Sequence, residues 1–180
     1  MPILTINLGY TAPINRPNQS PILAPAQVWA GLQRKVRRAQ DFVPVITACE
    51  VLSTSAPSPT DTDAAAGCTE IVTRTVTFAP GRGPLPGEGE KKVREVCKLF
   101  PPCRVDFWQE DGTKIANYVT QGEGEGELYL TYVFQWRVEG VEEGSEQTSE
   151  LEKGFRQTAR MAVEESIKAI RTMVEEGKLL

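Results

Sequence analysis

The hydrophobic and polar residues of this chain alternate with a period of two along several stretches. In ELYLTYVFQW, residues 127–136, a large apolar or aromatic side chain recurs at every second position from Leu128 to Trp136. This period is typical of a β-strand with one buried face. With turn-forming residues marking the ends, the same pattern predicts strands over residues 3–10, 47–54, 69–79, 91–100, 103–109, 113–121 and 127–138.

Two other stretches repeat their apolar residues at helical spacing. The first is APAQVWAGLQRKVRRAQ, residues 24–40, an amphipathic helix whose Arg and Lys side chains we expect to face water. The second follows Gly144 and continues to the C-terminus, and we place its capping box at Ser149 and Glu152. One apolar stripe runs along this long helix: Leu151, Phe155, Ala159, Ala162, Val163, Ile167, Ile170 and Val174.

The order of elements is strand, helix, six strands and long helix, which predicts one α+β domain over residues 1–180. Six strands joined by short links form an antiparallel meander, and the apolar face of such a sheet needs a cover. The long helix provides that cover, and a twisted sheet leaves a hollow beneath it. Residues 55–67, SAPSPTDTDAAAG, lack apolar bulk and are predicted to be a flexible loop tip.

Composition narrows the classes of function. The chain has 180 residues, a formal net charge of −4 and no histidine. Its basic residues do not gather in one stretch, which disfavours nucleic acid as a partner. The four cysteines contain no CxxC pair, so zinc-ligand spacing is absent and we expect no metal and no cofactor. Any chemistry is left to Asp, Glu, Lys, Tyr, Cys or Arg.

The expected location is the cytosol. The chain has no apolar run of the length that spans a membrane, and its N-terminus lacks the basic start and apolar segment of a secretory signal. We therefore expect no membrane insertion, and in a reducing compartment the cysteines are predicted to be buried thiols.

Several stretches together resemble a known family. They are AQVWAGLQRKV, FVPVITACEVL, TRTVTFAPG, VREVCKLFPPCRVDF, ELYLTYVFQWR and ARMAVEESIKAIRTMVEEGK. In this order they resemble the AtaL-like family of fungal proteins, a branch of the START and Bet v 1-like helix-grip superfamily called SRPBCC. The resemblance implies a seven-stranded antiparallel sheet wrapped around the C-terminal helix, with an internal apolar cavity. Members of the wider superfamily bind lipids, sterols or polyketides, and some cyclise or aromatise them.

Two ionisable residues share strand faces with apolar ones. Arg74 lies on the face of Val76 and Phe78, and Glu95 lies on the apolar face of the next strand. A hairpin centred between Pro84 and Leu85 places position 74 opposite position 95, where an inward ion pair is expected. Buried groups of this kind concentrate at functional sites. The alternatives are a purely structural pair, or a register shifted by one residue that turns both side chains to solvent.

Other residues are predicted to face the hollow and contact a ligand. Asn117 shares a face with apolar neighbours, and its amide needs a partner, for which a neighbouring strand or a buried water is the alternative. Packing in the core is the alternative for the apolar candidates. The predicted ligand-binding residues are Trp29, Val76, Phe78, Asn117, Leu130, Tyr132, Phe134, Trp136, Phe155 and Val163.

The glycine-rich link GRGPLPGEGEKK, residues 81–92, lacks P-loop spacing and leads into a strand, so phosphate binding is disfavoured. In the resembled fold this link borders the cavity mouth, which suggests a gate.

Three functions remain open. The first is a protein that binds a hydrophobic small molecule such as a lipid, polyketide or other secondary metabolite. The second is a cofactor-free cyclase or isomerase in which Glu95 moves a proton and Arg74 or Tyr132 stabilises an enolate-type charge. The third is a protein-interaction module with an unknown partner.

Overall fold

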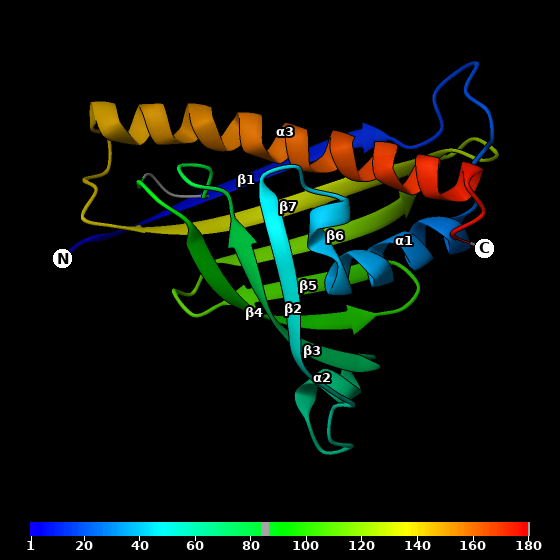
Figure 1. Ribbon diagram of the computed structural model, residues 1–180, viewed down its shortest axis with the longest axis horizontal. Helices are drawn as coiled ribbons and strands as arrows, with labels where there is room; N and C mark the ends of the chain where they lie inside the picture. The colour runs from blue at the N-terminus through cyan, green and yellow to red at the C-terminus, as the bar shows by residue number, and fades with distance from the viewer. Residues whose placement is uncertain (84–86, 180) are drawn as a thin grey trace.

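One antiparallel sheet contains all the strands of the computed structural model, which describes residues 1–83 and 87–179. The strands are β1 Ile3–Pro13, β2 Ile46–Ser55, β3 Glu70–Phe78, β4 Lys91–Phe100, β5 Arg104–Gln109, β6 Lys114–Gln121 and β7 Leu128–Glu139. Their spatial order is β1-β7-β6-β5-β4-β3-β2. Strands β2 to β7 therefore form the predicted meander, and β1 pairs with β7 so that the first and last strands lie side by side (Figure 1).

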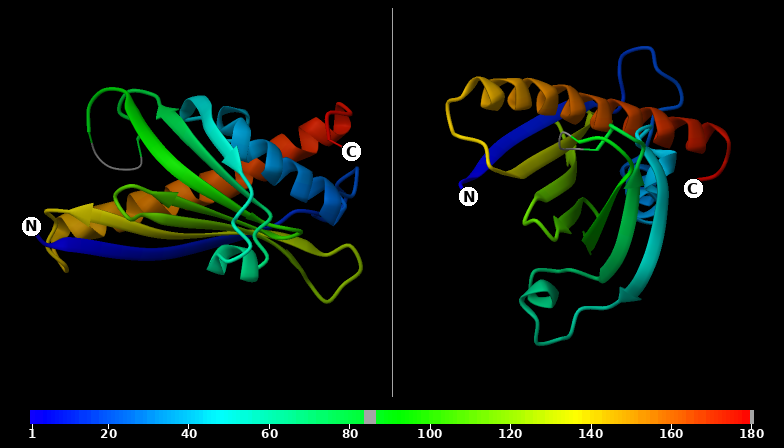
Figure 2. Two further views of the ribbon diagram at one scale, coloured as in Figure 1. Left: turned by 90° about the horizontal axis from the view of Figure 1, so that it is seen from below. Right: turned by 60° about the vertical axis from the view of Figure 1, so that its left-hand side comes forward.

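The helices in this part of the chain are α1 Pro25–Arg37, the short 3-10 helix η1 Ala39–Asp41, α2 Thr62–Ala65 and α3 Glu146–Glu175. Helix α3 packs along β1 and β7, and α1 lies beside the C-terminal half of α3. The sheet is strongly curved around the helices, as two further views show (Figure 2). The predicted α+β architecture, a seven-stranded sheet gripping a long C-terminal helix, is confirmed.

The core lies between the concave face of the sheet and helix α3. The alternating residues of β7 from Leu128 to Trp136 all point into it and are buried. Phe134 stacks on Trp136 with 4.4 Å between ring centroids, and Trp136 stacks on Phe155 of α3 at 4.1 Å. These aromatic contacts stabilise the packing of the helix on the sheet by more than the burial of apolar area alone.

Helix α3 begins earlier than the sequence suggested. Its N-cap is Ser145, whose hydroxyl accepts a hydrogen bond from the Thr148 backbone N–H at 3.2 Å. The Thr148 hydroxyl donates in turn to the Glu142 carbonyl at 2.7 Å. The predicted capping box at Ser149 and Glu152 is therefore wrong: both residues lie inside the helix, because the preceding serine and threonine already satisfy its first turn.

The segment 55–67, predicted to be a flexible loop tip, includes one short helical turn. It contains the short helix α2, and Asp63 of that helix pairs with Lys98 on β4 at 2.7 Å. The flexibility of the rest of this loop stays a prediction. Figure 2 shows the segment at the end of the sheet far from helix α3.

Helices α1 and α3 approach closely at Gly31. A Cβ at this position would lie 2.6 Å from Cγ1 of Ile170, well inside van der Waals contact. The missing side chain therefore lets α1 pack directly on α3 and brings the C-terminal turn of α1 over the concave face of the sheet.

Candidate functional site

A cavity of about 310 Å³ lies between the concave face of the sheet and helices α1 and α3. Its volume is at the lower end of the range for small-molecule sites, which suits a compact molecule better than a long chain. The apolar part of the wall consists of Ala39, Val43, Val45, Ile46, Phe78, Phe107, Ile115, Phe134, Trp136, Met161 and Ala162.

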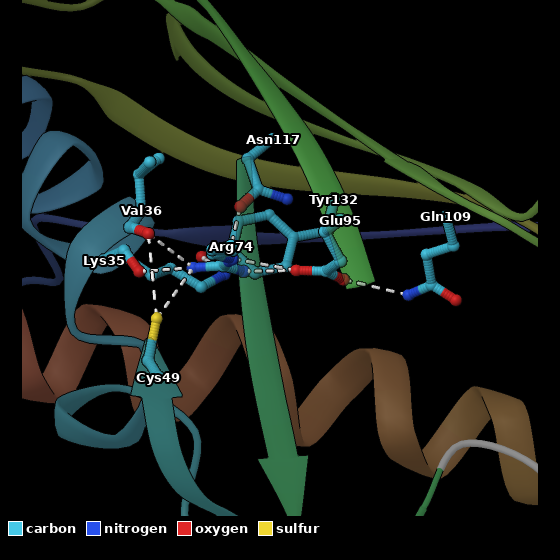
Figure 3. A network of polar contacts seen from close by, with 8 residues as sticks. All are labelled: Lys35, Val36, Cys49, Arg74, Glu95, Gln109, Asn117 and Tyr132. Carbon is cyan, nitrogen blue, oxygen red and sulfur yellow. Dashed lines mark hydrogen bonds and ion pairs between the residues drawn. The ribbon is translucent and has the colours of Figure 1, made fainter. Parts of the chain in front are cut away.

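A group of polar residues, here called the polar cluster, lines the same cavity: Lys35, Arg74, Glu95, Gln109, Asn117 and Tyr132. Figure 3 shows these side chains turned toward one another from helix α1 and from five strands of the sheet. The link after β3 also contributes Gly81, Arg82 and Gly83 to the wall, and helix α3 contributes Thr158. The cavity is therefore apolar with its polar groups gathered in one place.

Arg74 and Glu95 form a buried ion pair. They stand directly opposite each other on β3 and β4, as the hairpin argument predicted. Arg74 Nε and Nη2 donate to Glu95 Oε2 at 2.9 and 2.6 Å, and Gln109 Nε2 donates to Glu95 Oε1 at 2.9 Å. Both side chains are almost fully buried. Each oxygen of the carboxylate thus has a protein donor, which is what a buried charge requires.

Arg74 also holds the end of helix α1. Its Nη1 donates to the backbone carbonyls of Lys35 and Val36 at 2.8 and 2.9 Å. Carbonyls in the last turn of a helix lack partners within the helix, so a guanidinium placed there stabilises the helix end. The ion pair therefore also fastens α1 to the sheet, and four of the five N–H groups of the guanidinium donate to Glu95 or to the helix carbonyls.

Lys35 is a candidate site residue that sequence reasoning missed. The prediction that the cationic side chains of α1 face water is wrong here, because Lys35 is only 6% exposed. Its Nζ donates to Asn117 Oδ1 at 3.0 Å and to the Tyr132 hydroxyl at 2.9 Å. A signal was present: position 35 lies three residues after Leu32 and seven after Val28, so it shares their apolar face.

Burial changes the titration of this amine. Loss of hydration and, to a smaller extent, the nearby Arg74 guanidinium lower the pKa of Lys35 from 10.5 to about 7, although the Glu95 carboxylate opposes both. Near neutral pH the amine is therefore present in both charged and neutral forms. Burial also raises the pKa of the Tyr132 phenol, which stays protonated. The polar cluster can donate hydrogen bonds, and Lys35 can exchange a proton.

The structure places the predicted site residues in two groups. The cavity wall contains Arg74, Glu95, Phe78, Asn117, Tyr132, Phe134 and Trp136. The others pack in the core or at its edge, outside that wall: Trp29, Val76, Leu130, Phe155 and Val163. Strand periodicity identifies the inward face but does not say where along it the packing opens, which explains this second group.

The link after β3 borders the cavity, as the resemblance suggested. Gly81 and Gly83 line it, and Gly81 has a φ of +66°, which favours glycine. The hairpin centre at Pro84 and Leu85 lies outside the described residues, and gating stays a prediction. Within residues 1–83 and 87–179, no three or more Cys, Asp or Glu side chains form a metal-binding group, and no helix is long and apolar enough to cross a membrane.

Solved structures of the same architecture define the class of fold as helix-grip. The protein KanY matches with a TM-score of 0.62 and 13% identity, over 93% of this chain and 98% of its own. Ara h 8.0201 matches with a TM-score of 0.56 and 10% identity, over 95% and 99%. The di-domain ARO/CYC BexL from the BE-7585A biosynthetic pathway matches with a TM-score of 0.60 and 11% identity. That match covers 94% of this chain, which spans about half the length of the two-domain protein.

Sequence comparison identifies the family within this class. The family model described as Acetylaranotin biosynthesis cluster protein L matches residues 8–177, and the chain belongs to this family, AtaL. A relative of the same description from Aspergillus terreus (strain NIH 2624 / FGSC A1156) is 27% identical over 175 residues. The match covers 97% of this chain and 94% of the relative. The resemblance found from the quoted stretches is thereby confirmed.

Proposed function

We propose that the protein binds a hydrophobic small molecule in the cavity between the sheet and helix α3. The observation that carries this proposal is the hollow itself, in which apolar walls surround one buried polar cluster. This is the usual composition of a small-molecule site, where the polar groups orient the ligand. An unfilled apolar hollow lowers stability, and a bound ligand offsets that cost.

The relatives support a secondary metabolite as the ligand class. The A. terreus relative is named for the acetylaranotin biosynthesis cluster, and BexL comes from the BE-7585A biosynthetic pathway. The modest volume of the cavity favours a compact ring compound over a long acyl chain. We propose the cytosol as the location, because the four cysteines are free thiols, the state expected in a reducing compartment.

The first test is native mass spectrometry of protein purified without detergent from cells that normally make it. A bound ligand is expected as a reproducible extra mass that disappears on denaturation. A mass equal to that of the bare chain in every preparation would contradict tight, stoichiometric binding and would favour transient catalysis or a protein partner.

A matched pair of variants locates the binding. Thr158 lines the cavity, whereas its neighbour Gln157 is outside its wall and exposed on helix α3. Thr158→Trp is expected to fill the cavity and abolish binding, and Gln157→Trp is expected to leave binding as in the wild type. Equal binding by the two variants, measured with the same extracted ligand, would place the ligand elsewhere on the protein.

The second candidate is a cofactor-free cyclase or isomerase, favoured by the buried ionisable residues in the cavity wall. In this proposal Glu95 moves a proton. Tyr132 rather than Arg74 then stabilises the enolate-type charge by donating a hydrogen bond, because the guanidinium already donates to Glu95 and to two helix carbonyls. Glu95→Gln separates the candidates, provided that the variant is folded. A binding protein keeps most of its affinity in this variant, and an enzyme of this mechanism loses its turnover.

A further inference from the structure

Around Lys35 and Asn117, the hydrogen-bonding capacity left over in the polar cluster is on the donor side. Two N–H groups of protonated Lys35 are used, which leaves the third without a protein partner among the described residues. The side chain of Asn117 is fully buried, and its Nδ2 has no acceptor in the described part of the chain. Figure 3 shows its oxygen toward Lys35 and its nitrogen on the opposite side. A buried amide without an acceptor is costly, so this nitrogen marks a place for a missing acceptor.

The acceptors around Lys35, by contrast, each already accept a hydrogen bond. Both oxygens of Glu95 accept from Arg74 and Gln109. The oxygens of Asn117 and Tyr132 accept from Lys35. A ligand that reaches this end of the cavity therefore meets unused N–H donors rather than unused carboxylate oxygens, and an oxygen that only accepts hydrogen bonds fits best.

The charges point to the same kind of ligand. Among the described residues that line the cavity, Glu95 is the only acidic one, and its charge is matched by Arg74. Protonated Lys35 then adds one positive charge with no partner of opposite sign. An unmatched charge in an apolar interior costs several kcal/mol. The empty cavity avoids the cost when the amine loses its proton, and the filled cavity avoids it when the ligand brings a negative charge.

We infer that the cavity selects compounds with an anionic oxygen, a carboxylate, enolate or phenolate on an apolar skeleton, bound between Lys35 Nζ and Asn117 Nδ2. Tyr132 positions Lys35 for this contact by accepting its second hydrogen bond. The inference rests on the proposed function and names the class of ligand. Binding of the anion favours the ammonium form of Lys35, so above about pH 7, where the amine of the empty protein is mostly neutral, the protein takes up a proton from solvent when the anion binds.

The low pKa of Lys35 in the empty cavity gives this inference a pH dependence. The groups facing the amine are Arg74 on β3, Glu95 and Cys97 on β4, and Tyr132 on β7. Burial raises the pKa of Cys97 to about 12 and also raises that of Tyr132, so both stay neutral below about pH 9. Affinity for an anion is therefore fully present below pH 7 and falls as the pH rises above 7, by up to about tenfold per unit.

The test compares two probes of matched shape, 2-naphthoate and its neutral amide, 2-naphthamide, by titration calorimetry. At about pH 6.5 the wild type is expected to bind the anion roughly 10- to 100-fold more tightly, the range of one charge-assisted hydrogen bond. Toward about pH 9 this preference is expected to shrink while the affinity for the amide stays constant. Lys35→Met is expected to bind both probes equally and at the affinity of the neutral one.

The outcomes are distinguishable. Equal affinity of the wild type for both probes, or a preference that survives in Lys35→Met, would overturn the inference and leave the proposed function standing. If Arg82→Met removes the preference for the anionic probe and Lys35→Met does not, the charge of Arg82 explains that preference, and the inference is also overturned. If neither probe binds, the proposed function fails and the inference fails with it. The comparison of probes on the wild type needs no variant and remains decisive if a variant does not fold.

Discussion

Replacing Lys35 by methionine is predicted to stabilise the empty protein near neutral pH. Methionine has about the same length and needs no hydration, whereas the buried ammonium has lost its water without gaining a partner of opposite charge. The substitution releases Asn117 Oδ1 and the Tyr132 hydroxyl, and that loss reduces the gain. The gain should therefore depend on how much of Lys35 is protonated, which pH controls.

The sign follows from the pKa in each state. In the unfolded chain Lys35 titrates near 10.5, and in the folded protein at about 7. Below pH 7 both states are protonated and the folded state bears the full penalty. Between pH 7 and 10.5 the unfolded state holds more protons, so the stability of the wild type rises with pH. From about pH 6 to about pH 9 this rise amounts to roughly 2–3 kcal/mol, at 1.36 kcal/mol per pKa unit.

The assay is urea denaturation followed by tryptophan fluorescence, since Trp136 lies in the core. The quantity of interest is the free energy of unfolding of Lys35→Met minus that of the wild type at each pH. Cys97 and Tyr132 weaken both proteins at high pH, because their pKa values are raised in the folded state, and they cancel in this difference. The difference is expected to favour the variant at about pH 6 and to shrink by about 2–3 kcal/mol toward about pH 9.

Lys168→Met is the matched control, because the Lys168 side chain is 75% exposed and its ammonium stays in water whether the chain is folded or unfolded. This control is expected to give a difference that does not change with pH. A difference for Lys35→Met that is equally flat would refute the reasoning, since it would mean that folding does not alter the titration of Lys35.

Three further predictions concern the framework of the site and use the same denaturation assay. Glu95→Leu and Arg74→Met are each expected to cost about 3–5 kcal/mol, and the double variant Arg74→Met/Glu95→Leu less than the sum of these two changes, because each single change strands one buried group. Additive costs would contradict a coupled pair. Gly31→Ala is expected to destabilise by about 1–3 kcal/mol, since its Cβ would lie 2.6 Å from Ile170 of helix α3. Its control, Gly154→Ala, has no atom within 4 Å of the added Cβ and should stabilise the helix by about 0.5–1 kcal/mol. The same sign for both changes would show that packing does not decide the effect at position 31. Ser145→Ala is expected to cost about 1 kcal/mol through loss of the N-cap of α3, and no measurable change would indicate that the helix starts elsewhere.

The amino-acid sequence alone determined the architecture and one part of the site. Alternation of apolar residues in the strands and helical spacing in residues 24–40 and 146–175 are local properties, so they could be read without neighbours. Because the links between the last six strands are short, these strands were expected to form an antiparallel meander, as they do. The pairing of Arg74 with Glu95 was predictable for the same reason, because the two positions belong to one hairpin and lie only 21 residues apart.

Only the tertiary structure decided which residues surround the cavity and what Lys35 does there. Lys35 and Asn117 are 82 residues apart, and Lys35 and Tyr132 are 97 apart, so no local pattern connects them. Their contact depends on where α1 is placed, which is set by the close approach at Gly31 and by the hydrogen bonds from Arg74. Periodicity says which side of an element faces inward. Whether an inward side chain packs in the core, binds a partner or borders empty space depends on the elements that face it across the fold.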